Sequence, residues 1–172
     1  MSSPSSTTPR RPSAPPAERE ALECRAARDP ADVAAHYRLR RRVFVDEQRL
    51  FSPDDRDEHD DDARTVHVVG LIGDEVFGAV RIYPLDEAAT LWKGDRLAVA
   101  RGRRTNHLGA ALVHFAVATA GVQGGRRMIA HIQLPNVPFF EHLGWSAVGD
   151  PKPFVGVEHQ LMSIELRPRR AP

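Results

Sequence analysis

A strand, a basic turn and a helix follow one another between Leu97 and Leu112, and this segment constrains the fold most. Leu97-Ala98-Val99 is apolar and has strand character, and an amphipathic helix begins at about residue 107. A strand that enters a helix in this way points the free N–H groups and the positive dipole end of the helix at the turn. The turn also carries Arg101, Arg103 and Arg104. It is therefore predicted to bind a phosphate-bearing ligand.

Two common phosphate-binding motifs do not fit this turn. A P-loop ends in Gly-Lys-Ser/Thr, and the chain contains no such tripeptide. A dinucleotide-binding fingerprint needs three spaced glycines and an acidic residue about 20 residues later. Only Gly102 and Gly109 are available here, and the acidic residue is missing. The sequence thus points to a different kind of phosphate-bearing ligand.

The turn instead resembles a motif of the GNAT family, the N-acetyltransferases that use acetyl-CoA. Residues 104–109 read Arg-Thr-Asn-His-Leu-Gly, which is similar to the family's Gln/Arg-x-x-Gly-x-Gly/Ala turn around the CoA pyrophosphate. His107 stands where the family has its first glycine, so its side chain must turn away from the phosphates or hydrogen-bond to them. The resemblance assigns these residues to cofactor binding: Arg104, Thr105, Asn106, His107, Leu108, Gly109 and Ala110.

Three further segments match the family in order and spacing. Residues 136–145 resemble the Asn-x-x-x-Phe-Tyr-Glu-x-Leu-Gly-Phe segment near the end of GNAT domains, and 78–82 resemble a Gly-x-x-Arg-Ile/Leu strand. Residues 42–48, Arg-Val-Phe-Val-Asp-Glu-Gln, are similar to GNAT branches that include acyl-homoserine-lactone synthases and a bacterial subgroup associated with nitrogen starvation. The chain is therefore identified as a member of the GNAT family from about Ala34 to Leu166.

An α/β fold is expected, with a mixed, mostly antiparallel sheet flanked by helices and a splayed cofactor cleft. Asp29 and Pro30 are typical of a helix start, and that helix is predicted to run to about Glu47. The helix at about 107–122 is predicted to bury Leu108, Ala111, Leu112, Phe115 and Val122. A short helix is expected at 136–143, and strands at 22–26, 65–72, 75–83, 91–99, 127–133, 145–149 and 158–166.

Composition limits the other possibilities. With 172 residues, of which 41% are hydrophobic, one domain can bury a core, and we expect it over 18–167 between tails at 1–17 and 168–172. A net charge of +1 argues against nucleic-acid binding, and no apolar run reaches the roughly 20 residues that span a bilayer. A single cysteine, Cys24, fits the reducing cytoplasm.

The resemblance also implies how the cofactor binds. In GNAT proteins, pantetheine enters between the cofactor strand and the strand that follows the cofactor helix. The backbone of Leu97, Ala98 and Val99 would then bind pantetheine, with an N–H near Val99 facing the thioester oxygen. One such positioned donor is worth about 3 kcal/mol. Asn136 and Phe140 are also assigned to the cofactor.

Phe140 departs from the family, because many members have a tyrosine there that protonates the leaving thiolate. Water, His131 or His142 must take over that role, or turnover is slow. A base must also accept a proton from the attacking amine. His131 and Glu47 are the candidate catalytic residues, with a half-buried histidine bonded to backbone and a carboxylate in a surface ion pair as the structural alternatives. His67 is a weaker third candidate.

An acidic run at 54–62 raises the question of a metal site. It fails the EF-hand pattern, because no glycine takes the sixth position of the loop and no glutamate closes it. We therefore predict a solvated loop without metal, which would attract a cationic amine or polyamine to the cleft.

The predicted function is transfer of an acetyl group from acetyl-CoA to a primary amine of a small molecule in the cytoplasm. One alternative is transfer of a longer acyl chain, as in the homoserine-lactone synthases, favoured by a wide pocket between Leu91-Trp92 and the helix 107–122. Another is a CoA-binding sensor or partner subunit with weak catalysis. We expect no membrane or nucleic-acid partner, and a homodimer is left open.

Overall fold

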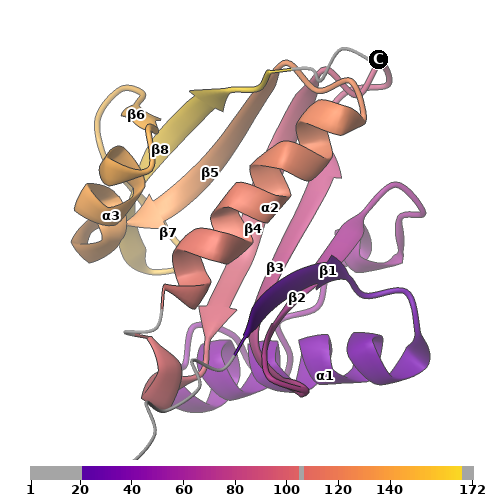
Figure 1. The fold of residues 1–172 in the computed structure, drawn as a ribbon. Coiled ribbons are helices and arrows are strands. Elements are labelled where there is room, and N and C mark those ends of the chain that lie inside the picture. Colours follow the sequence, from indigo (N-terminus) through magenta and orange to yellow (C-terminus); the bar gives the residue numbers. More distant parts are fainter. Residues whose placement is uncertain (1–20, 105–106, 168–172) are drawn as a thin grey trace, which may run out of the picture.

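One mixed sheet organises the molecule (Figure 1). The computed structural model describes residues 21–104 and 107–167. The strands are β1 (Leu22–Ala26), β2 (Val66–Ile72), β3 (Glu75–Pro84), β4 (Leu91–Val99), β5 (Arg127–Gln133), β6 (Ser146–Ala147), β7 (Lys152–Phe154) and β8 (Val157–Glu165). Their order is β1-β2-β3-β4-β5-β8-β6, with β7 also pairing with β8. The β4–β5 pair is parallel, and the other pairs are antiparallel, as predicted.

The first predicted helix has two parts. α1 (Pro30–Arg40) begins where the Asp29 side chain accepts a 2.8 Å hydrogen bond from the N–H of Asp32, with proline in the first turn. The chain then continues as a π-helix over Arg41–Glu47, which ends where the N–H of Gln48 donates to the carbonyl of Val43. The predicted start and end of this helix are confirmed, although the wider helical turn in its second half was not predicted.

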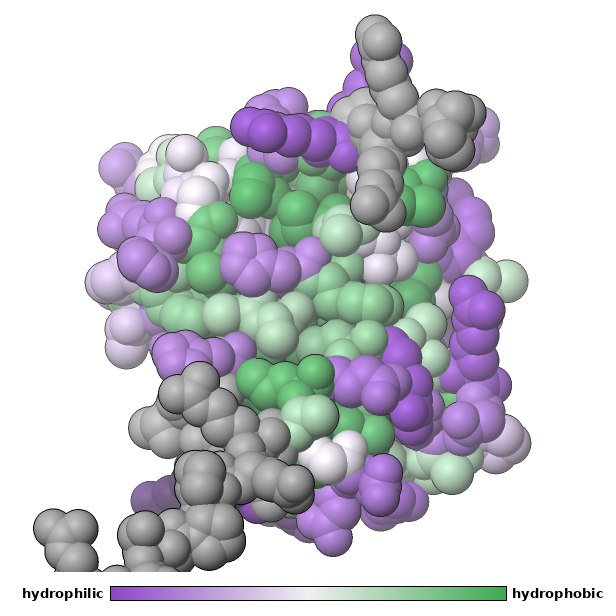
Figure 2. Space-filling model, in the orientation of Figure 1, coloured by the Kyte–Doolittle hydropathy of each residue, from purple (hydrophilic) through white to green (hydrophobic). Residues whose placement is uncertain are grey.

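α2 (Leu108–Val122) packs against the sheet face that is turned to the viewer in Figure 1. Leu108 and Leu112 are fully buried against this face, as predicted. The prediction was wrong for Val122, which is 67% exposed in the last turn of the helix. Figure 2 shows hydrophobic residues across the middle of this face and hydrophilic residues around its edge.

Two glycines allow α2 to approach the sheet closely. A Cβ atom at Gly78 of β3 would lie 2.6 Å from a methyl of Leu112, and one at Gly70 of β2 would lie 2.8 Å from a methyl of Leu108. On the opposite face, α1 and the π-helix cover a second core made of Leu39, Val43, Phe44, Ala79, Ala98 and Ala100. The two helical layers therefore pack on the two faces of one sheet.

β4 and β5 pair only at one end. Their parallel pairing joins Leu91–Lys93 to Arg127–Ile129, whereas β4 runs on to Val99 and β5 to Gln133. β4 also has a β-bulge against β3. Asp95 pairs with Arg81 and Ala98 pairs with Ala79, so β4 advances by three residues where β3 advances by two. Arg96 lies in this bulge with a left-handed φ of 53°. The predicted splay between the two strands is thus present.

The C-terminal part follows the prediction less closely. α3 (Val137–His142) ends before Gly144, whose φ of 89° makes the predicted left-handed cap. The strand expected at 145–149 is reduced to the two residues of β6. β7 was not predicted, since its three residues include a proline and lie near Gly149 and Gly156.

Candidate functional site

The principal candidate site is a pocket of about 160 Å³ at the splay between β4 and β5. Both strands contribute to its wall, through residues 93–97 of β4 and 130–133 of β5. Successive side chains of a strand point to opposite faces of a sheet, so the pocket is bounded on both faces. On the α2 face its lining is apolar and consists of Val113, Ala116, Met128, Ala130, Ile132, Phe140 and Trp145.

The lining on the α1 face is more polar. The π-helix and the loop after it supply Phe44, Gln48, Leu50 and Phe51. Phe154 and Val155 come from β7 and the turn after it. The strands β4, β5 and β8 supply the polar members, which are Lys93, Asp95, Arg96, His131, Gln133 and His159. The pocket therefore connects an apolar chamber beneath α2 with a mixed chamber beneath the π-helix. A ligand lying between the strands can be reached from the α1 face.

His131, a predicted catalytic residue, lies in this lining. Its ring stacks on Phe154, with ring centroids 5.2 Å apart and planes 13° from parallel. Partial burial lowers the pKa of His131 below 6.5, and the positive charge of Lys93 lowers it further. The imidazole is consequently neutral at pH 7 and able to accept a proton.

Glu47, the other predicted catalytic residue, is not part of the lining. Its carboxylate accepts a 2.6 Å charge-assisted hydrogen bond from Arg104, and the Arg104 side chain also donates to the carbonyl of Val99. Glu47 was predicted as a base and Arg104 as a phosphate ligand, and in the structure the two side chains are bound to each other. Beside them, Gln133 donates to Gln48 across the pocket mouth at 3.1 Å.

The acidic run is a solvated loop only in part, because Asp54, Glu58 and Asp61 are exposed whereas two other members are buried. Asp55 is 1% exposed and Asp60 is 7% exposed, and both bind the buried guanidinium of Arg40 at 2.7 and 2.6 Å. Burial alone would raise the pKa of Asp60, but hydrogen bonds from Arg40 and from the N–H of Asp57 hold it below its ordinary value. The prediction failed because the partners of these carboxylates lie on distant elements.

Two more arginines complete this ion cluster and connect it to the pocket. Arg81 of β3 binds both oxygens of Asp57, at 2.6 and 2.9 Å, and both oxygens of Asp95. Arg96, at the β4 bulge, donates to Asp55 and Asp57 and lies 4.4 Å from the Phe51 ring. The cluster therefore fixes the side chain of Arg96 in the pocket wall. Arg81 within an otherwise apolar strand was the sequence signal for buried carboxylate partners.

His67 is held in the same region, away from the pocket. Its Nδ1 lies 3.3 Å from Nε2 of His36, and its Nε2 lies near the backbone carbonyl of Asp60. The structural alternative, a half-buried histidine bonded within the fold, describes its surroundings. No group of three or more metal-ligating side chains is arranged for an ion within residues 21–104 and 107–167.

The residues assigned to the cofactor lie along β4, α2 and α3. Leu97, Asn136 and Phe140 line the pocket, whereas Ala98 belongs to the α1-side core and Val99 packs on the α2 side. Gly109 and Ala110 lie in the first turn of α2, beside the buried Leu108. Thr105 and Asn106 lie outside the described residues.

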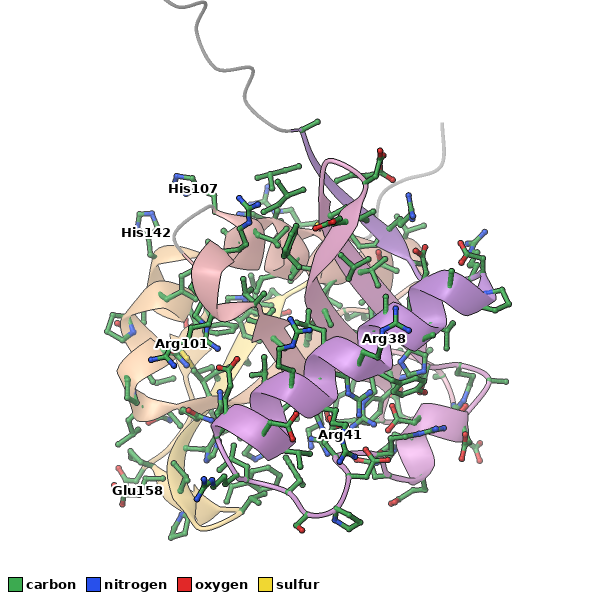
Figure 3. All side chains as sticks on the ribbon, turned by 90° about the horizontal axis from the view of Figure 1, so that it is seen from below. Arg38, Arg41, Arg101, His107, His142 and Glu158 are labelled. Carbon is green, nitrogen blue, oxygen red and sulfur yellow. The ribbon has the colours of Figure 1, made fainter. Side chains whose placement is uncertain are left out.

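His107 precedes α2 with a left-handed φ of 59°, a conformation that glycine adopts without steric cost. Arg101 is exposed in the turn before it, and Arg103 lies over the Phe77 ring at 4.7 Å. Figure 3 places His107 and His142 at the same edge of the molecule, with both side chains directed outward. His142 is exposed on α3 and does not line the pocket.

A protein-family model described as the acetyltransferase (GNAT) family matches residues 33–145, about two thirds of the chain. The chain belongs to the GNAT family. This GNAT chain is accordingly an acyltransferase.

Solved structures share the fold of this GNAT chain. A candidate N-acetyltransferase from Lactobacillus plantarum is 24% identical, with 85% of this chain and 99% of that chain covered and a TM-score of 0.74. The CoA-dependent acyl-homoserine lactone synthase BjaI is 23% identical, with coverages of 85% and 83% and a TM-score of 0.69. An acyl-CoA N-acyltransferase from Pseudomonas aeruginosa is 20% identical, with coverages of 83% and 97% and a TM-score of 0.70.

GNAT enzymes use acetyl-CoA, and three features of this site fit that molecule. Beyond Lys93 and Ile129 the facing edges of β4 and β5 have no recorded pairing with each other, so their backbone groups are available to a ligand. Trp145 lines the pocket, and its Nε1–H is buried without a hydrogen-bond partner among the described residues. The start of α2 supplies free N–H groups for phosphate.

None of the helices in the described ranges combines the length and the apolar character needed to cross a bilayer.

Proposed function

We propose that this GNAT enzyme transfers an acetyl group from acetyl-CoA to a primary amine of a small molecule. The observation that carries the proposal is the pocket at the β4–β5 splay, which is lined by residues from both sheet faces and by a histidine that is neutral at pH 7. The cofactor arm fits between the strand edges, and the amine approaches from the α1 face. Both substrates can then be bound together at the splay.

Acetyl-CoA, when bound, supplies an activated thioester. The backbone of Leu97–Val99 is proposed to orient the pantetheine arm, and Arg104 with the first turn of α2 to bind the pyrophosphate. Arg101 and Arg103 are proposed to lie near the remaining phosphate. Thr105 and Asn106 are included in this assignment because of the family motif, as are Asn136 and Phe140 at the other side of the pocket.

His131 is proposed as the general base. In the balanced reaction a C–N bond forms, the C–S bond breaks, the amine loses a proton to the base and the thiolate gains one. The structure favours His131 over Glu47 for this role, because His131 lines the pocket while Glu47 is bound to Arg104. Phe140 carries no proton, and His142 lies outside the lining, so water or protonated His131 is proposed to protonate the thiolate.

The test is release of free CoA thiol, measured with a thiol reagent against a panel of amines. Replacing His131 with Gln is expected to lower kcat/KM about 100-fold and to abolish the acid limb of its pH profile. That limb should lie below pH 6.5 in the unmodified enzyme, since the pKa of His131 is lowered from that value.

The matched control is His114→Gln, because His114 is an exposed histidine on α2 outside the pocket lining. Its kcat/KM should stay within about twofold of the unmodified enzyme. Thiol release unchanged by His131→Gln would remove the base assignment. Absence of release with every amine would leave a CoA-binding sensor or partner subunit, the remaining alternative.

A longer acyl donor is the second candidate, and the apolar chamber favours it. Val113, Ala116, Met128 and Trp145 surround space beneath α2 that a hydrocarbon chain can fill. Leu91 and Trp92 are absent from this lining, so the chamber is not at the place where the sequence suggested a wide pocket. A series of acyl-CoA donors from two to eight carbons separates the candidates, because kcat/KM should be highest for acetyl-CoA if the first proposal holds.

The cellular compartment and the class of substrate are proposed from composition alone. One cysteine and the absence of a strongly basic surface charge favour a cytoplasmic enzyme that acts on small molecules rather than on nucleic acid. A homodimer stays a prediction, to be tested by light scattering.

A further inference from the structure

The acceptor side of the pocket has an unusual charge balance. Among the described residues that line it, only Asp95 carries a carboxylate, and this carboxylate accepts hydrogen bonds from Arg81 at 2.8 and 2.7 Å. Arg96 is likewise bound, to Asp55 and Asp57. Lys93 is different, because within residues 21–104 and 107–167 its ammonium group makes no ion pair. The ammonium group instead lies over the Phe154 ring, with Nζ 5.8 Å from the ring centroid.

Lys93 and His131 lie at the same aromatic ring. Phe154 stacks on His131, approaches Lys93, and meets the edge of His159 at a centroid distance of 5.4 Å. Burial lowers the pKa of His131, and the charge of Lys93 lowers it further. Because Lys93 and His131 border the same ring, a positive charge lies near the proposed base. A positively charged group close to His131 would be repelled there.

Apolar side chains surround this charged corner. Phe44, Leu50 and Phe51 line one side, and Phe154 and Val155 line the other. Phe154 and Val155 keep 39% and 41% exposure, so they offer apolar surface to a ligand. An acceptor that fills this chamber needs an apolar body as well as an anionic group for Lys93.

We infer that the acceptor is an amine that also carries a carboxylate and an apolar side chain, with the carboxylate bound by Lys93. This inference rests on the proposed function and specifies its acceptor. It replaces the expectation of a polyamine, because the buried members of the acidic run that would have attracted one are bound to Arg40, Arg81 and Arg96. A polyamine would place a second cation beside Lys93 without a free carboxylate to compensate it.

The experiment compares acceptors that differ only in the carboxylate. L-phenylalanine, L-phenylalaninamide and phenethylamine form one set, L-leucine, L-leucinamide and isoamylamine a second, and spermidine represents the polyamines. Thiol release with acetyl-CoA gives kcat and KM for each acceptor. Titration calorimetry with the CoA-saturated enzyme gives binding constants that do not depend on turnover.

The carboxylate member of each set is expected to have a kcat/KM at least about tenfold above its amide, mainly through KM. The amide has the more acidic ammonium group and hence more neutral amine at pH 7, so this order runs against intrinsic reactivity. Lys93→Met should reduce the preference to within about twofold, and Lys93→Arg should restore most of it.

The control is Lys152→Met, which removes the chain's other lysine, an exposed residue of β7 outside the pocket lining. It should leave the preference unchanged. Equal use of acid and amide, a better rate with spermidine, or an unchanged preference in Lys93→Met would each overturn the inference.

The calorimetry separates this inference from the proposed function. Lys93-dependent binding of the amino acids without thiol release would support the acceptor class and refute the transferase. Thiol release with phenethylamine and without a preference for the carboxylate would support the transferase and refute the acceptor class. Failure of every acceptor to bind the CoA-saturated enzyme would overturn the inference.

Discussion

At the scale of single residues, this chain departs from its family where the cofactor is expected to bind. His107 occupies a glycine position of the GNAT motif and adopts the left-handed conformation that glycine favours. Arg104, the expected pyrophosphate ligand, is bound to Glu47. Both features place a small cost on cofactor binding, and each can be tested by one substitution.

Replacing His107 with Gly is expected to tighten CoA binding about three- to tenfold. The change removes the imidazole and the Cβ beside the N–H groups of α2 and so clears the approach of the phosphates. The left-handed strain of about 1 kcal/mol is present with and without CoA, so its relief adds to stability and not to affinity. Calorimetry with CoA measures the effect. His107→Ala is the control, because it removes the imidazole and keeps the Cβ. If both variants bind CoA more weakly, the imidazole itself contacts the phosphates, and the idea that His107 weakens CoA binding is refuted.

Replacing Glu47 with Gln should lower KM for acetyl-CoA about threefold, because Arg104 no longer has to leave a carboxylate in order to bind phosphate. The turnover number should change little. Asp46→Asn is the matched control, since it removes a neighbouring exposed charge that has no recorded ion pair with a described residue. A 100-fold loss of kcat with unchanged KM would instead identify Glu47 as the base.

At the scale of elements, the contact between α2 and the sheet depends on the absence of side chains on β2 and β3. Gly70 and Gly78 face Leu108 and Leu112, which fill the space that a Cβ would need. This packing sets the height of the α2 N-terminus above the splay of β4 and β5. The helix that is proposed to supply phosphate-binding N–H groups is thus positioned by glycines on the two strands that precede β4 in the sheet.

Gly78→Ala is expected to destabilise the protein by about 1–3 kcal/mol, because the new methyl would lie 2.6 Å from a buried leucine methyl. Urea unfolding measures the change. The control is Gly102→Ala, where nothing lies within 4 Å of the added Cβ and the stability should change by less than about 0.5 kcal/mol. Equal effects of the two substitutions would show that α2 adjusts freely.

The elements that the sequence predicted correctly are those with a strong local pattern. β4, β5 and α2 match their expected bounds within one residue. The apolar end of β4, the alternation in β5 and the helical spacing of α2 are visible inside each segment. The burial of Asp55 and Asp60 was not predictable in this way, because it depends on Arg40 of another element.

The residues of the candidate site were likewise predicted only in part. Asn136 and Phe140 were predicted from a segment that resembles the family, and His131 was predicted from its place on the strand expected to line the cleft. All three line the pocket. Lys93 and Phe154 were missed, because neither belongs to a motif and they meet through the pairing of β7 with β8. Sequence reasoning therefore identified the cofactor side of the pocket better than the acceptor side.

At the scale of the whole molecule, a buried polar cluster links the α1 layer to the sheet. His36 on α1 hydrogen-bonds to the carbonyl of Val68 and lies beside Arg40 and His67. Burial lowers the pKa of His36 from 6.5 to about 3, and the charge of Arg40 contributes to the shift. The unfolded chain therefore takes up a proton below pH 6.5 that the folded chain does not accept.

The free energy of unfolding is accordingly expected to fall as the pH drops from 6.5 toward 4, by up to about 1.4 kcal/mol per pH unit for His36. Asp60 adds a further loss only below pH 3.8, because its folded-state pKa lies under that value. Urea unfolding between pH 7 and 4.5 measures the slope. His36→Asn, which keeps a donor near the carbonyl of Val68, should make the slope shallower, and His67, whose pKa is also lowered by burial, keeps the remainder. An unchanged slope would refute the assignment to His36.

The bulge and splay of β4 leave the sheet with an aperture instead of a continuous wall. The lining of this aperture comes from different elements on the two faces, since α2 covers one face and the π-helix and β7 border the other. Under the proposed function, substitutions at β7 and the π-helix would change the acceptor side and leave the proposed coenzyme A side intact. One architecture can in this way serve many amines.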